Sequence, residues 1–276
     1  MRLLLHFLLF FVTFLTTTGA GALQAGFNPF SSLGAFLKGL PFSLTMMFIL
    51  LSHELGHYFA SRHHRVAVTL PYFIPAPSLI GTFGAFIKIK ASMPNRRVLF
   101  DIGIAGPLAG IIVSLPILAY GLIHSRIIIT SLPPKGLVLG ENLLLKFLTA
   151  TIWGKLPETA QIVLHPTAFA GWIGLFVTAL NLIPVGQLDG GHIAYALLGE
   201  KYHGWLSRIM IISLVGLGFL GWQGWLIWAV LLLFLGIGHP PPMDSFISLD
   251  RKRNILGVIA LLIFILTFTP VPFSMH

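Results

Sequence analysis

The stretch "FILLSHELGHYFASRHHR", residues 48–65, places ionisable side chains inside an apolar run. Its first part is apolar enough for the lipid core, yet it is followed by His53, Glu54 and His57, which lie within about one helical turn of one another. Each ionisable group in a bilayer core costs roughly 2.5–3.5 kcal/mol or more. That cost favours a functional site inside a membrane-spanning helix over an interior polar cluster or a polar helix end near the cytoplasm.

The composition indicates a membrane protein. Of the 276 residues, 56% are hydrophobic and 9% are charged, whereas a soluble domain carries about 25% charged residues. The net charge is +9, but the basic residues lie between apolar runs, where they set membrane orientation. We therefore expect a lipid bilayer around the chain and no nucleic acid partner. The chain has no cysteine, which excludes disulfides, thiolate zinc ligands and a catalytic thiol.

Apolar runs long enough to cross about 30 Å of hydrocarbon recur along the chain. They cover residues 3–18, 41–61, 98–123, 166–184, 205–221, 222–238 and 254–273. The predicted fold class is therefore an all-α polytopic membrane protein with six or seven transmembrane helices and a small membrane-associated β-hairpin. The first run could be a cleaved signal peptide, because Ala20 and Ala22 resemble a signal-peptidase site, but we expect a retained helix.

The distribution of basic residues predicts the orientation. With the N-terminus inside, the inner segments hold twelve of the 17 Lys and Arg residues and the outer segments hold five. The positive-inside rule selects this arrangement. We expect one integral-membrane domain over residues 1–276, in which 1–22 form the first helix or a signal-like segment, about 40–195 the catalytic core, and about 205–273 the C-terminal helices.

Two segments do not look like simple spans. Residues 66–92 contain three prolines, and within them "AFIKIKA" at 85–91 alternates apolar and basic residues, as is typical of a strand. The outer stretch 125–165 has no clear span, although residues 137–153 could form an interfacial helix.

The spacing of His53 and His57 predicts a metal site. Residues four apart on a helix project from the same face, so two imidazoles can grip one zinc ion. Glu54 lies beside them and could act as a base toward the attacking water. Catalytic zinc has three protein ligands and one open position.

The third ligand has few candidates. Of eight acidic residues, only Glu54, Asp101 and Asp189 lie in or at the edge of apolar runs. Asp189 follows the fourth run, which like the second is predicted to cross from outside to inside. His57 and Asp189 should therefore reach the inner side at similar depth, and we predict a site of His53, His57 and Asp189 that holds one zinc ion per chain.

At this point the sequence resembles the site-2 protease family of intramembrane zinc metalloproteases. The resemblance rests on "HELGH" at 53–57 and "NLIPVGQLDG" at 181–190, with "GPLAG" at 106–110 between them, and it covers about residues 40–195. It implies that Asp189 is the third zinc ligand and that Asn181 lies near the substrate path. The chain looks like a compact form without a PDZ domain.

The resemblance also implies the reaction and its place. Members hydrolyse peptide bonds in or near transmembrane segments of partner membrane proteins, with Glu54 here as catalytic base. The compact form points to a bacterial-type inner membrane, or alternatively a plastid membrane, with the active site toward the cytoplasmic side. Whether the chain forms a homo-oligomer is left open.

A substrate helix must unwind before its carbonyls can be attacked. An exposed strand edge at residues 81–90 could hold the unwound segment by strand addition, with Gly81, Phe83, Gly84 and Phe86 in contact with substrate. The alternative is an ordinary interfacial hairpin with basic anchors. Asn181 could bind the substrate backbone or only satisfy a helix loosened at Pro184.

Two further residues could act near the metal. Asp101 could support a zinc ligand from the second shell or serve only as an acid at a helix N-terminus. His192 could be a spare ligand, orient Asp189 or only stabilise the turn. The rival functions are a membrane metal-ion transporter and a catalytically silent chaperone of membrane helices.

Overall fold

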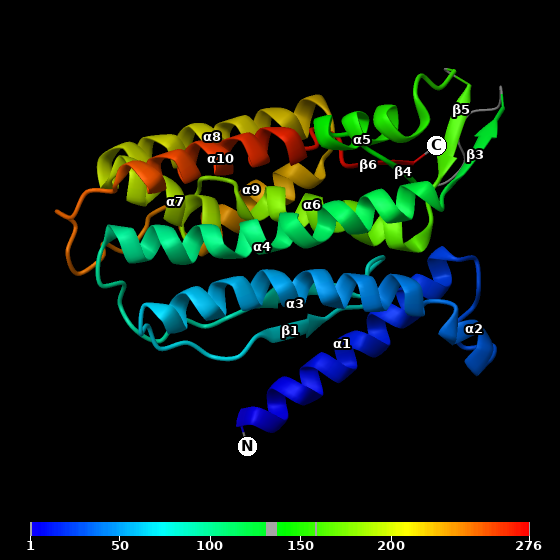
Figure 1. Ribbon diagram of the computed structural model, residues 1–276, viewed down its shortest axis with the longest axis horizontal. Coiled ribbons are helices and arrows are strands. Elements are labelled where there is room, and N and C mark those ends of the chain that lie inside the picture. The colour runs from blue at the N-terminus through cyan, green and yellow to red at the C-terminus, as the bar shows by residue number, and fades with distance from the viewer. Residues whose placement is uncertain (1, 131–136, 158, 276) are drawn as a thin grey trace. The chain divides into compact units, whose positions relative to one another are not determined.

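The computed structural model of the chain is mostly helical and describes residues 2–130, 137–157 and 159–275 (Figure 1). In chain order the elements are α1 (Arg2–Gln24), α2 (Leu33–Leu37), α3 (Leu40–His63), β1 (Tyr72–Pro75), β2 (Thr82–Phe86), α4 (Arg96–Ile123), β3 (Arg126–Ile129), β4 (Leu137–Leu139), α5 (Leu143–Trp153), β5 (Ala160–Val163), α6 (Pro166–Asn181), α7 (Asp189–Leu198), α8 (Glu200–Leu220), α9 (Gly224–Leu235), α10 (Arg251–Thr267) and β6 (Phe273–Met275).

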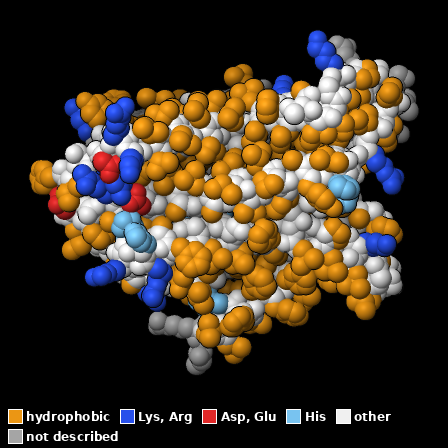
Figure 2. Space-filling model, in the orientation of Figure 1, with side chains coloured by type: hydrophobic (Ala, Val, Ile, Leu, Met, Phe, Trp, Pro, Cys, Tyr) orange, Lys and Arg blue, Asp and Glu red, His pale blue; other side chains and the backbone are white. Residues whose placement is uncertain are grey.

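Three helices in the described part of the chain are long and apolar enough to cross a membrane: α1 from residue 3, α4 and α8. Each coincides with one of the predicted runs. The other predicted runs form α3, α6, α9 and α10, but α6, α9 and α10 have only 16, 12 and 17 residues. The helical class is confirmed, whereas the total of six or seven spans stays a prediction. Figure 2 shows hydrophobic side chains over much of the visible face, as a membrane protein requires.

The described residues form three two-stranded sheets, where we expected one hairpin. The expected hairpin is β1–β2, with Tyr72 opposite Phe86 and Pro75 opposite Thr82. The pairs β3–β5 and β4–β6 were not predicted, since each joins segments far apart in the sequence. Within 137–153, the predicted helix is found as α5, and its interfacial position stays a prediction. Residues 137–139 instead form β4, which pairs with the C-terminal β6.

The chain divides into two compact units, and the first comprises residues 1–90, 109–128 and 160–175. In it α1 lies beside α3 and β1 (Figure 1). The helices approach closely because Gly39 has no side chain, and a Cβ there would collide with the carbonyl of Thr18. The buried hydroxyls of Thr17 and Ser43 are 2.6 Å apart and hydrogen-bond across the two helices.

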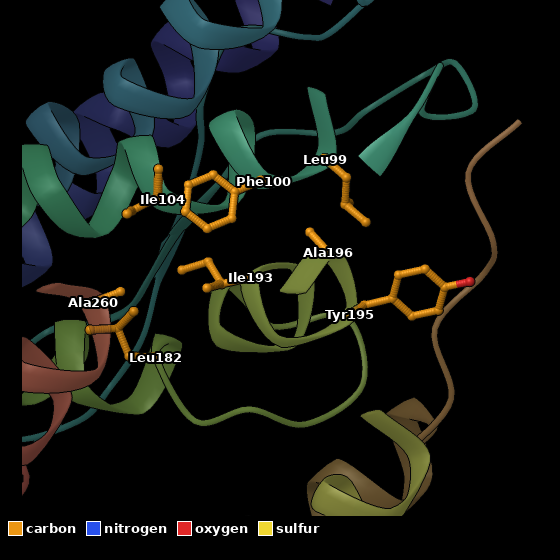
Figure 3. Packing of buried hydrophobic residues seen from close by; sticks show 8 residues of the cluster. All are labelled: Leu99, Phe100, Ile104, Leu182, Ile193, Tyr195, Ala196 and Ala260. Atoms are coloured by element: carbon orange, nitrogen blue, oxygen red, sulfur yellow. The ribbon is translucent and has the colours of Figure 1, made fainter. Parts of the chain in front are cut away.

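The second unit comprises residues 91–108, 129–159 and 176–276. Its core joins α4, α7 and α10, and Figure 3 shows its buried side chains meeting there. The buried members are Leu99, Phe100, Ile104, Leu182, Ile193, Tyr195, Ala196 and Ala260. Arg96 adds a polar link, because its Nε donates a hydrogen bond of 2.9 Å to the carbonyl of Ala196 near the end of α7. This packing fixes the helix that begins at Asp189.

Candidate metal centre

Helix α3 carries His53, Glu54 and His57, and all three are buried, with exposed fractions of 4%, 6% and 7%. The Nε2 atoms of the two histidines are 3.2 Å apart. Two imidazoles that bind one tetrahedral zinc ion at roughly 2.0–2.1 Å place their nitrogens about 3.3 Å apart. The separation of the two rings therefore matches a shared ion.

The surroundings of α3 explain how polar side chains are held there. The preceding turns bury Met46, Ile49 and Leu50, which anchor the helix by apolar packing. Gly174 of α6 comes so close that a Cβ would lie 2.8 Å from Cγ2 of Ile49. The helix ends after Arg62 and His63, where basic residues suit the negative end of the helix dipole.

Asp189 is the first residue of α7, and the turn before it is built from local hydrogen bonds. The amide of Leu188 donates to the carbonyl of Val185 at 3.2 Å, and the amide of His192 to the carbonyl of Leu188 at 2.9 Å. A carboxylate in the first turn of a helix is stabilised by the helix dipole. The helix that we expected to be loosened at Pro184 ends at Asn181, and a new helix begins eight residues later.

Glycines make this turn compact. Gly186 has φ +55°, in the left-handed region that glycine adopts without strain. A Cβ at Gly190 would collide with the carbonyl of Leu182, and one at Gly191 with the carbonyl of Gly186. Glycine is therefore needed at positions 190 and 191, because the start of α7 lies in contact with the turn that precedes it. The need for Gly191 was not predicted.

The ligand atoms of His53, His57 and Asp189 all lie within 4.8 Å of one another, so the three residues form a group that could hold a metal ion. The set of two imidazoles and one carboxylate fits zinc, which accepts both nitrogen and oxygen ligands and needs three of them in catalytic sites. These are the three residues that the sequence predicts as ligands.

The other predicted residues have distinct places. Asn181 is the half-buried last residue of α6. Asp101 on α4 forms a two-point ion pair with Arg253 at the start of α10, with Nε–Oδ1 and Nη2–Oδ2 distances of 2.8 and 2.6 Å. Its partner Arg253 was not predicted.

His192 has a partner that the sequence does not reveal. Its Nδ1 lies 2.6 Å from Nε2 of His239, in the segment between α9 and α10, and Nδ1 of His239 lies 2.7 Å from the carbonyl of Pro240. A carbonyl only accepts, so Nδ1 of His239 donates and its Nε2 accepts from His192. Burial lowers the pKa of His239, which favours this neutral form. Tyr195 stacks on His239 with ring centroids 4.6 Å apart. This contact links the first turn of α7 to the segment between α9 and α10, and the predicted roles of His192 stay predictions.

The predicted substrate residues lie in the hairpin of the first unit. Gly81 and Gly84 have φ +76° and +99°, which other residues rarely adopt. Phe83 is 74% exposed and Phe86 is 47% exposed. Strand β2 pairs with β1 alone among the described strands, so its second edge has no strand partner there.

A family profile described as Peptidase family M50 matches residues 41–219, which contain His53, Glu54, His57 and Asp189. The chain belongs to Peptidase family M50. Membership confirms the resemblance to site-2 proteases that the two motifs predicted. The M50 match together with the apolar helices supports a location in a membrane.

Curated relatives agree with the M50 assignment. The chain is 34% identical to "Probable zinc metalloprotease EGY2, chloroplastic" of Oryza sativa subsp. indica, over 89% of this chain and 45% of that protein. It is 34% identical to "Probable zinc metalloprotease EGY1, chloroplastic" of Arabidopsis thaliana, over 84% of this chain and 43% of that protein. A rice protein named "Probable zinc metalloprotease EGY3, chloroplastic" is 25% identical over 92% of this chain and 46% of its own length. The chain thus spans about half the length of these relatives.

Proposed function

We propose that this chain is an intramembrane zinc metalloprotease that hydrolyses peptide bonds in or near transmembrane segments of partner membrane proteins. The observation that carries the proposal is the buried histidine pair of α3, whose ligand atoms lie within 4.8 Å of a carboxylate oxygen of Asp189. Membership of a peptidase family and the printed names of the relatives support the same activity.

In this proposal His53, His57 and Asp189 hold one zinc ion per chain. When bound, zinc supplies Lewis-acid chemistry that polarises the scissile carbonyl and makes water a nucleophile near neutral pH. Glu54 takes the proton of the attacking water and later delivers it to the leaving amine. Its place on α3, one residue after His53, keeps its carboxylate close to the reacting atoms.

The proposal extends to the membrane arrangement. We infer one functional domain over residues 1–276, six or seven transmembrane helices, and an active site toward the cytoplasmic side of a bacterial-type inner membrane or the equivalent side of a plastid membrane. The excess of Lys and Arg in the inner segments supports the orientation. Asn181 is proposed to face the substrate, and Asp101 and His192 to hold the surroundings of the zinc ligands in place.

The second edge of β2 is proposed as the place where an unwound substrate binds as an added strand. Main-chain donors and acceptors of this edge would pair with the substrate, while exposed Phe83 and Phe86 contact its side chains. Because proline lacks the amide donor, single proline substitutions from Phe83 to Ile89 should weaken substrate capture at alternate positions. Capture can be measured by crosslinking a model transmembrane substrate. Equal capture across the whole series would reject the strand-addition proposal and leave an interfacial hairpin.

The activity itself is tested with purified full chain in liposomes that also contain a model single-span substrate. We expect cleavage fragments that disappear after treatment with a zinc chelator and return when zinc is added back. The same liposomes loaded with a zinc-sensitive dye serve as the control for transport. Zinc flux into the liposomes without any cleavage would contradict the protease and favour a metal transporter.

A further inference from the structure

A cavity of about 570 Å³ lies in the first unit, and its lining does not include the histidine pair. One part of its lining comes from the first turns of α1, with Leu3, Leu5 and His6. The other part comes from Tyr72 at the start of β1 and from the extended segments that flank the hairpin, where the lysines Lys88 and Lys90 contribute. The cavity therefore combines an apolar wall with two cationic side chains.

Hydrogen bonds from their backbone amides hold the two lysines beside the segment that contains Ala67 and Thr69. The amide of Lys88 donates to Oγ1 of Thr69 at 2.9 Å, and the amide of Lys90 donates to the carbonyl of Ala67 at 2.8 Å. Alternate residues of an extended chain point to the same side, so the side chains of Lys88 and Lys90 leave the ribbon on one face, about 6.6 Å apart along it. Two ammonium groups at that spacing can grip one phosphate-containing headgroup.

The charge of this lysine pair is not neutralised by the protein. Within residues 2–130, 137–157 and 159–275, no carboxylate forms an ion pair with Lys88 or Lys90. Both lysines are exposed. A site that presents two unpaired cations calls for an anionic occupant.

The apolar wall of the cavity indicates which kind of anion would bind there. Helix α1 is long and apolar enough to span a membrane, and at its start Leu3 and Leu5 are 56% and 45% exposed. The lipid site rests on the orientation inferred above, which puts these first turns at the inner membrane surface. Basic pockets beside transmembrane helices on that side bind the headgroups of anionic lipids.

Contacts made by the lining residue His6 hold the two walls of the cavity together. Nδ1 of His6 is 3.0 Å from the carbonyl of Pro71, and the ring of His6 lies 4.1 Å from that of Tyr72. These contacts tie α1 to the ribbon. An occupant can therefore place its charge on the lysines and its hydrocarbon along α1.

We propose that this cavity binds one anionic phospholipid of the inner leaflet. The headgroup phosphate lies between Lys88 and Lys90, and the acyl chains follow the exposed leucines at the start of α1. The lipid bridges α1 to the ribbon that continues β2. An acidic peptide would find the two cations but would leave the exposed leucines uncovered, which is why we favour a lipid. The site does not depend on zinc or on proteolysis.

The test measures phosphatidylglycerol binding to the purified full chain by native mass spectrometry, with phosphatidylcholine as the neutral comparison. We expect one tightly bound phosphatidylglycerol per chain and a raised thermal unfolding midpoint. The double variant Lys88→Gln, Lys90→Gln should bind it about 10- to 30-fold more weakly. Each lysine near an anionic surface contributes about 1 kcal/mol to binding, and about 1.4 kcal/mol corresponds to a tenfold change in affinity. The double variant Lys88→Arg, Lys90→Arg keeps both charges and should keep the lipid.

The matched control is Lys201→Gln, Lys252→Gln, which removes two exposed lysines that are also predicted on the inner side. This control should bind phosphatidylglycerol as the wild type does. Equal loss in both glutamine variants would mean that only net charge matters, and unchanged binding in the first would exclude the cavity. Displacement of the lipid by a soluble acidic peptide would overturn the lipid assignment in favour of a peptide site.

Discussion

Replacing Glu54 with Gln should leave zinc bound and stop cleavage of a membrane substrate. Glutamine has nearly the shape of glutamate, so α3 and its buried histidines keep their packing. It cannot take a proton from the attacking water, and general acid–base catalysis contributes roughly 10²–10⁴-fold to rate. We therefore expect cleavage by the Glu54→Gln variant to fall by at least about 10²-fold. The measurement is fragment yield from a model transmembrane substrate in liposomes, beside zinc content by elemental analysis.

The control for this variant is Glu141→Gln. The control makes the same Glu-to-Gln change at an exposed position. Glu141 forms an ion pair with Lys146, with a distance of 3.5 Å between Oε2 and Nζ. Exposed pairs contribute only about 0–1 kcal/mol, so this variant should cleave and bind zinc as the wild type does. A Glu54→Gln variant that cleaved at the wild-type rate would remove Glu54 from the role of base.

Replacing Asp189 with Ala should remove zinc as well as activity. Loss of an outer-shell partner of a metal ligand already costs roughly 10–100-fold in affinity, and loss of a ligand should cost more. The helix α7 should still form, because alanine is the best helix former and the core of the second unit does not include Asp189. Zinc affinity is measured by competition with a chelating dye.

Asp250→Asn is the matched control for the aspartate. Asp250 caps α10, where its Oδ1 accepts a hydrogen bond from the amide of Arg253 at 3.0 Å. Asparagine caps helices about as well as aspartate, so this variant should fold and keep its zinc. Loss of zinc in the control would mean that disturbance of the fold, rather than loss of a ligand, explains the result at Asp189.

The histidine pair could be predicted because its geometry is local. Residues four apart on a helix lie next to each other in any surroundings. The 3.2 Å between the Nε2 atoms of His53 and His57 follows from that spacing. Asp189 could be proposed because carboxylates in apolar runs are few. The break before it was visible in Pro184 and Gly186, although the start of a new helix at Asp189 was not.

What escaped prediction depends on long-range contacts. His239 is 47 residues from His192, and a single histidine before prolines carries no motif that would reveal their contact. Strands β4 and β6 pair across about half the length of the chain, so no local sequence pattern indicates their pairing. Helices α6, α9 and α10 overlap predicted apolar runs, but each helix is shorter than its run. The apolar run continues past the end of the helix, so hydropathy alone does not mark where the helix ends.

The most direct test of the account is the zinc content of the purified chain, compared between the wild type, Glu54→Gln and Asp189→Ala at one free zinc concentration. The account predicts one zinc ion per chain in the wild type and in Glu54→Gln, and far less in Asp189→Ala. One zinc ion per chain in Asp189→Ala, with unchanged affinity, would contradict it.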